Sequence, residues 1–126
     1  MKDSFIHYFH QLLDQLEAEV LAYTDEDNLW LKTEGIKNTA GNLCFHIIGN
    51  LNHFIGFALG ETGYERDREF EFTVPFVKQE DLVAGIRNTK VMIEKVISDI
   101  NDLEAPYPEV LHREGVTGSI GHQLMR

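Results

Sequence analysis

The chain has 126 residues, of which 43% are hydrophobic and 25% are charged. This size and composition predict one folded domain, 1–126, with a buried core, and they argue against a disordered chain. Eleven lysine and arginine residues stand against 21 aspartate and glutamate residues, which gives a formal net charge of −10. Because the basic residues are scattered through this acidic chain, phosphate backbones would be repelled and we expect no nucleic-acid partner.

The apolar segments are too short or too interrupted to predict a membrane span. The longest, Leu43–Leu59, is broken by histidine and asparagine side chains before it reaches the roughly 18 uninterrupted apolar residues of a spanning helix. The N-terminal stretch MKDSFIHYFHQLLDQLEAE has no apolar signal core. The single cysteine, Cys44, excludes a disulfide framework within the chain and fits a reducing compartment. We therefore expect a cytoplasmic protein without a membrane partner.

The first predicted helix begins near Asp3 or Ser4 and ends near Tyr23. Its apolar face repeats every three or four residues. That face consists of Phe5, Ile6, Phe9, Leu12, Leu13, Leu16 and Val20. His7 and His10 lie one turn apart and could share a metal ion. A packing or polar-face role is favoured for them, because the sequence places no third ligand nearby.

Two connections separate the next helices. In Thr24–Asn38, Trp30 either lines a pocket or closes one end of a helical bundle. In Glu61–Lys78, the alternation of apolar and polar residues over Phe70–Val74 is locally strand-like. Since no partner strand is evident, we predict an extended segment that crosses the bundle.

The second predicted helix carries the longest apolar run, with Thr39 as its N-cap and Gly60 at its C-terminal cap. Glycine is unfavourable inside a helix by about 1 kcal/mol relative to alanine, yet this helix contains three. They are Gly41, Gly49 and Gly56. Their spacing of seven and eight residues places them near one stripe, which predicts the close approach of a neighbouring element.

The third predicted helix, Gln79–Asn101, is long and amphipathic. After a loop over Glu104–Gly115, Thr117 or Ser119 would cap a fourth helix that reaches only about two turns by Arg126. Three long helices and such a stub leave one wall of an antiparallel bundle open. We expect either further residues after Arg126 or a partner chain to cover it.

The same flank of the second helix presents His46, Asn50 and His53. His46 and His53 are separated by two turns, about 10 Å along the axis, so at most one of them can bind a given metal ion. His46 is either such a ligand, completed from other helices, or a buried histidine satisfied by a hydrogen bond. Cys44, on the apolar face, is expected to be an inert core thiol.

The segments GNLCFHIIGNLNHFIG, GYERDREFEF, APYPEV and TGSIGHQLM, with a long amphipathic helix between the second and third, resemble the DinB/YfiT-like superfamily. Within it the chain is similar to a branch of small bacterial proteins of undetermined function. The similarity covers nearly the whole chain, from Phe5 to Arg126. Its most specific parts are the helix around His46 and the loop containing Arg66 and Arg68. The resemblance implies an all-α, antiparallel (up-down) four-helix bundle, commonly a homodimer, with the fourth helix incomplete in this chain.

The resemblance also implies a divalent transition metal, such as nickel, zinc or iron. In that family one histidine comes from the second helix and two come from an H-x-x-x-H pair in the fourth. His46 matches the first position, whereas the pair would fall a few residues after Arg126. His122 lies about ten residues too early to replace it.

Characterised members of the family include transferases that stabilise a low-molecular-weight thiolate for attack on an electrophile, and others look like metal-dependent hydrolases. By this resemblance Asn50 and His53 are pocket residues or support the metal ligand. Arg66 or Arg68 contacts an anionic group or fastens its loop. Equally open are salt bridges from both arginines to Glu65 or Glu69 and to neighbouring helices. A non-enzymatic dimerisation or partner-binding module, in which His46 is a core polar residue, is open as well.

Overall fold

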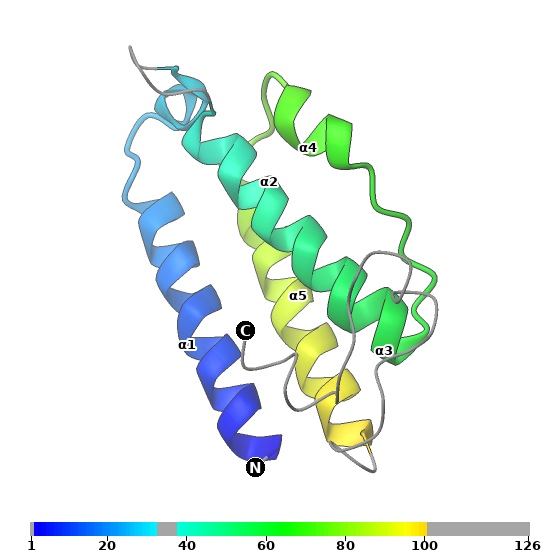
Figure 1. The fold of residues 1–126 in the computed structure, drawn as a ribbon. Helices are drawn as coiled ribbons and strands as arrows, with labels where there is room; N and C mark the ends of the chain where they lie inside the picture. Colours follow the sequence, from blue (N-terminus) through cyan, green and yellow to red (C-terminus); the bar gives the residue numbers. More distant parts are fainter. Residues whose placement is uncertain (1, 33–37, 101–126) are drawn as a thin grey trace.

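The computed structural model describes residues 2–32 and 38–100, and all regular structure in these ranges is helical (Figure 1). The prediction of a helical protein is confirmed. The three long elements are α1 (Lys2–Leu21), α2 (Ala40–Leu51) and α5 (Gln79–Asp99). The shorter elements are the 3-10 helix η1 (Glu26–Trp30), the π-helix η2 (Asn52–Phe57), α3 (Ala58–Gly60) and α4 (Arg68–Thr73). The predictions for residues 101–126, including the fourth helix and His122, lie outside the described residues.

Helices α1 and α5 are antiparallel neighbours that enclose much of the core (Figure 1). At one end the Lys2 ammonium donates to the Ser98 carbonyl at 3.3 Å. At the other end the Gln79 amide donates to the Val20 and Tyr23 carbonyls at 2.8 and 2.9 Å. The apolar stripes predicted for both helices face each other. The hydrophobic effect therefore holds the pair together, while these polar contacts satisfy carbonyls at the helix ends.

Helices α2 and α5 run in the same direction (Figure 1). The Asn52 amide donates to the Thr89 hydroxyl at 3.0 Å, and further along both helices Gly60 lies against Val96. Parallel helices cannot be joined by a tight turn, so residues 61–78 carry the chain back to the level at which α2 begins. The expected strict up-down alternation is therefore wrong for this pair, because a crossover segment replaces a hairpin.

Thr39 caps α2, as predicted. Its hydroxyl accepts from the Asn42 backbone N–H at 3.0 Å and donates to the Asn42 side-chain oxygen at 2.7 Å. The helix continues without a break through η2 into α3, and its C-cap is Glu61, with a left-handed φ of 51°, rather than Gly60. Gly60 is instead placed where a Cβ would overlap Val96, so close packing explains the glycine.

The continuous helix Ala40–Gly60 is long and apolar enough to cross a membrane by length and composition, with mean hydropathy 1.3 in its most apolar window. The core helix of a soluble protein passes the same test. The cellular location therefore stays a prediction.

The strand-like reading of Phe70–Val74 is wrong, because residues 68–73 form α4 (Figure 1). The Asp67 carboxylate accepts from the Phe70 N–H at 3.0 Å and caps the helix, and the Val74 N–H bonds the Phe70 carbonyl at 2.9 Å. A period of two over five residues does not distinguish a short strand from one and a half turns of helix. The helix is favoured over the strand here because Asp67 caps its N-terminus and Glu71 makes contacts with α2.

Trp30 has the packing role, closing the end of the structure at which α2 begins. Its ring lies 2.7 Å from the position a Cβ would take at Gly41, and its indole N–H donates to the Val77 carbonyl at 3.2 Å. Rings of Phe45 and Phe76 flank it at centroid distances of 6.4 and 6.1 Å. The indole therefore joins η1, α2 and the chain just before α5.

We expect Ile86→Ala in α5 to destabilise the protein by about 2–5 kcal/mol, because it empties a fully buried site. Ile86 is 0% exposed, whereas Val91 on the same helix is 69% exposed. Val91→Ala is the matched control and should change stability by at most about 0.5 kcal/mol. Urea unfolding followed by circular dichroism measures both. Equal effects would contradict the described placement of α5.

Candidate functional site

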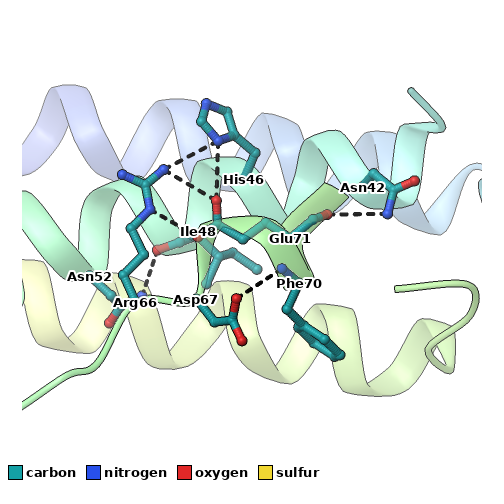
Figure 2. A network of polar contacts seen from close by, with 8 residues as sticks. All are labelled: Asn42, His46, Ile48, Asn52, Arg66, Asp67, Phe70 and Glu71. Atoms are coloured by element: carbon teal, nitrogen blue, oxygen red, sulfur yellow. Dashed lines mark hydrogen bonds and ion pairs between the residues drawn. The ribbon is translucent and has the colours of Figure 1, made fainter. Parts of the chain in front are cut away.

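Three charged or ionisable side chains from two separate segments of the chain meet beside α2: His46, Arg66 and Glu71 (Figure 2). Arg66 donates to both oxygens of the Glu71 carboxylate, from Nε at 3.0 Å and from Nη2 at 3.2 Å. The His46 Nδ1 lies 3.2 Å from Oε1 of Glu71 and 3.3 Å from Nη2 of Arg66. Glu71 is 3% exposed, so this fork of hydrogen bonds satisfies a carboxylate that has left water.

Gly49 makes room for that carboxylate. A Cβ built at Gly49 would overlap the Glu71 side chain, so no other residue fits there without displacing it. The glycine stripe of α2 thus does mark close approach, as predicted. The approaching group differs along the stripe: the Trp30 ring at Gly41, Glu71 at Gly49 and the Thr62 hydroxyl at Gly56.

Asn42 fastens the backbone of α4 to the start of α2. Its side-chain amide donates to the Glu71 carbonyl at 3.2 Å and to the Val74 carbonyl at 3.0 Å, while its oxygen accepts from Thr39. All polar atoms of this buried amide are therefore paired. Asn42 holds the main chain of α4 in place, and Glu71 is thereby held at the level of His46 (Figure 2).

The His46 ring has two different sides. Its side chain is 30% exposed, and the Phe72 ring lies against it at a centroid distance of 4.9 Å and an angle of 35°. Nδ1 faces Glu71 and Arg66, whereas the second ring nitrogen, Nε2, points away from those contacts (Figure 2). His46 also lines a mostly apolar groove between α1 and α2, with a volume of about 390 Å³. The other lining residues are Phe9, Leu12, Leu13, Gln15, Leu16, Glu19, Ile47, Asn50 and Leu51.

The structure brings together only part of the predicted site. Asn50 lines the groove with His46, as expected from their spacing. His53 instead lies in η2, where its ring stacks on Phe57 at a centroid distance of 5.7 Å, and it is not among the groove residues. Arg68 is exposed and takes no part in the contacts around His46.

Arg66 does fasten its loop to α2, which was one of the two predicted roles. Its partner is Glu71 of α4, so Arg66 forms the predicted salt bridge to a neighbouring helix and not those to Glu65 or Glu69. The sequence analysis does not identify Glu71 as a site residue, because it predicts an extended segment where α4 forms. The available signal was Gly49, three residues after His46, which marked a close approach without naming the approaching group.

Within residues 2–32 and 38–100 no group of three or more His, Cys, Asp or Glu side chains is placed to hold a metal ion. His7 is exposed, and His10 turns toward α5, where its Nε2 lies 3.9 Å from a Glu94 carboxylate oxygen. The exposed side of His7 and the contact of His10 with α5 are the surroundings that the favoured polar-face or packing role predicts. Of the described residues that line the groove, His46 and Glu19 carry side chains that can bind a metal ion, which is fewer than the three protein ligands of a usual catalytic site.

Burial sets the chemistry of two further groups. The Cys44 thiol is 1% exposed, and desolvation raises its pKa to about 11, as expected for an inert core thiol. The pKa of Tyr64 is also raised, first by burial and then by the negative charge of Glu71, while Arg66 acts in the opposite direction. The charges of the site therefore extend to Tyr64 in the segment before α4.

We expect Glu71→Gln to destabilise the protein by about 3 kcal/mol, because Arg66 would keep a charge in a largely buried site without its counter-ion. Glu69→Gln, two residues away on exposed α4 surface, is the matched control and should be nearly neutral. Chemical unfolding of both variants gives the comparison. A Glu71→Gln protein as stable as the control would show that the ion pair is not formed.

The buried Cys44 should react slowly with a thiol reagent such as 5,5′-dithiobis(2-nitrobenzoate) at pH 8. Both its raised pKa and its enclosure act in this direction, since only about one thiol in a thousand is ionised three pH units below the pKa. The protein unfolded in guanidinium is the control and should react at least about a hundredfold faster. Rapid labelling of the folded protein would contradict the placement of Cys44 in the core.

Comparison of the chain with protein-family models, with curated proteins and with solved structures gave no match. The DinB-like resemblance therefore stays a prediction.

Proposed function

We propose that this protein is a DinB-like bundle that binds a divalent transition metal through Nε2 of His46. The observation that carries the proposal is the orientation of this ring. Nδ1 is engaged by the interior of the protein, while Nε2 is turned away from these contacts on a residue that lines the groove between α1 and α2 (Figure 2). Imidazole nitrogen is a ligand that nickel, zinc and iron accept, and helical bundles build metal sites from facing helices.

The described residues fit one position of such a site. His46 supplies a nitrogen ligand, and the described ranges contain no group of three His, Cys, Asp or Glu side chains that would complete a site around it. In our proposal the remaining ligands are the H-x-x-x-H pair that the resemblance assigns to a fourth helix. With that helix the chain would form a four-helix bundle of DinB type, assembled as a homodimer.

As an enzyme, the protein would transfer an electrophilic group to a low-molecular-weight thiol. The thiol sulfur bonds to the electrophilic carbon, the leaving group departs with its bonding electrons, and the thiol proton passes to solvent. The metal, when bound, lowers the pKa of the thiol and holds the thiolate. The groove residues Leu16 and Leu51 would exclude water from an apolar electrophile, and Asn50 would orient it by hydrogen bonding. A metal-dependent hydrolase is the related alternative.

We place this activity in the cytoplasm, without a nucleic-acid or membrane partner. The net charge of −10 and the alternation of Arg66 and Arg68 with acidic residues supply no basic surface for phosphate groups. We assign His53 and Arg68 no role in the proposed metal site, because neither is among the residues that line the groove.

A non-enzymatic dimerisation or partner-binding module is the second candidate. It is favoured by one observation: the contacts among Arg66, Glu71 and His46 already explain this histidine as a fastening for α4. Leu12 and Ile47, which line the groove, are exposed apolar side chains that a second helix could cover.

Metal binding separates the two candidates. We expect isothermal titration with Ni²⁺ and Zn²⁺ to give about one site per chain, with affinity reduced at least about tenfold in His46→Ala, because the substitution removes a ligand. His7→Ala, an exposed histidine on α1, is the matched control and should bind as the wild type does.

Absence of binding, or equal binding by His46→Ala, would reject the metal proposal in favour of the module. If metal binds, activity is assayed with several low-molecular-weight thiols and a chromogenic electrophile. Rates no higher than those of His46→Ala would reject the transferase.

A further inference from the structure

We propose that Glu71 is a positioning residue that selects the tautomer of His46. In this assignment the neutral ring carries its proton on Nδ1, which donates to Oε1 of Glu71, and Nε2 keeps a free lone pair. The inference concerns the imidazole itself and stands on hydrogen-bond geometry. Its use in metal binding rests on the function proposed above.

Two groups lie within hydrogen-bond distance of Nδ1, and a hydrogen bond to each would require a different tautomer of the ring. Nη2 of Arg66, at 3.3 Å, can only donate and would require an unprotonated Nδ1. Oε1 of Glu71, at 3.2 Å, can only accept when ionised and would require Nδ1–H. The two contacts cannot both be hydrogen bonds of a neutral ring, so one of them must dominate.

Glu71 dominates because Arg66 already has its acceptors. Nε and Nη2 of Arg66 are aligned on the two carboxylate oxygens, at 3.0 and 3.2 Å, which is the bidentate arrangement a guanidinium prefers. An unprotonated Nδ1 would instead hold its lone pair against an anionic oxygen. With the Glu71 side chain only 4% exposed, water does little to screen that repulsion. The charge-assisted bond from Nδ1–H removes it, and we expect a preference of about tenfold or more for this tautomer.

The surrounding structure fixes which edge of the ring meets the carboxylate. Gly49 leaves the space that the Glu71 side chain occupies, and Asn42 holds the backbone of the same residue. Phe72, one residue further along α4, packs on the His46 ring. A half-turn of the ring, which would put Cδ2 in the place of Nδ1, would have to occur between these contacts. The Nε2 lone pair is therefore directed away from Glu71 as a consequence of packing.

This arrangement is the one in which a histidine binds a metal ion well. Ligating histidines usually donate their other N–H to a carboxylate or carbonyl, which fixes the tautomer and makes the ligating nitrogen more basic. Loss of such a partner typically weakens metal binding about 10–100-fold. Glu71 would thus be needed for affinity although it does not touch the metal.

The tautomer is measured by long-range ¹H–¹⁵N correlation on the ¹⁵N-labelled chain, at a pH where the ring is neutral. We expect protonated Nδ1 and unprotonated Nε2 for His46 in the wild type. Glu71→Gln should shift the ring toward Nε2–H, because the carboxylate is gone and Arg66 becomes free to donate to Nδ1. Arg66→Gln should keep Nδ1–H, because the carboxylate remains. Glu69→Gln is the control for a charge change on α4.

An Nε2–H ring in the wild type overturns the inference, and so does loss of Nδ1–H in Arg66→Gln, since Arg66 would then control the tautomer. An unchanged tautomer in folded Glu71→Gln also overturns it. If Glu71→Gln does not fold, as judged by circular dichroism, the wild-type and Arg66→Gln spectra decide alone.

Zinc titration of the same proteins tests the use of this tautomer. We expect Glu71→Gln to bind Zn²⁺ about 10–100-fold more weakly than the wild type and Glu69→Gln to bind equally. A wild type with Nδ1–H that binds no zinc rejects the proposed function and leaves the tautomer assignment standing. Zinc binding that depends on His46 but is unaltered in Glu71→Gln overturns the role of Glu71 in metal affinity.

Discussion

The burial of one carboxylate constrains much of this structure. A charged group that leaves water loses several kilocalories per mole of solvation, and an ion pair offsets this only where its geometry is good. For Glu71 the offset comes from two guanidinium N–H groups and the His46 ring. Space is equally necessary, and it exists because residue 49 has no side chain. Four positions from two separate segments of the chain are thereby made dependent on one another.

This constraint also shapes the path of the chain. The buried pair draws α4 onto α2, where Asn42 holds its backbone, so residues 61–78 become a supported crossover (Figure 1). A crossover of this kind allows α2 and α5 to run in the same direction, which a tight turn would not. Between α2 and α1 the groove forms, and His46 lies at its boundary with the contacts of α4. The fold therefore places His46 between a satisfied interior and an open apolar groove.

Periodicity predicted the long helices well, because their apolar stripes extend over many turns and face one another in the core. Local chemistry predicted the cap at Thr39, and the glycines of α2 predicted close approaches. The site itself was only half visible in the sequence. Glu71 lies 25 residues from His46 and five from Arg66, and neither separation is a helical or strand repeat. Charge pairs chosen by adjacency gave Arg66 the wrong partners, since burial rather than proximity in sequence decides which carboxylate needs a counter-ion.

The two nitrogens of the His46 ring bear on different explanations for this residue: Nδ1 on a structural role and Nε2 on a role as a metal ligand. To hold α4 in place, residue 46 needs only one N–H that donates to Glu71, and the side-chain amide of a glutamine at position 46 would supply it as well. An imidazole offers, in addition, a second nitrogen fixed in direction by the bond that the first one makes. That nitrogen belongs to a side chain that is 30% exposed and lines a groove whose walls are mainly leucine, isoleucine and phenylalanine. A fastening alone does not account for a basic lone pair in such a place, whereas a ligand site does, and this difference is why the metal proposal is preferred over the module.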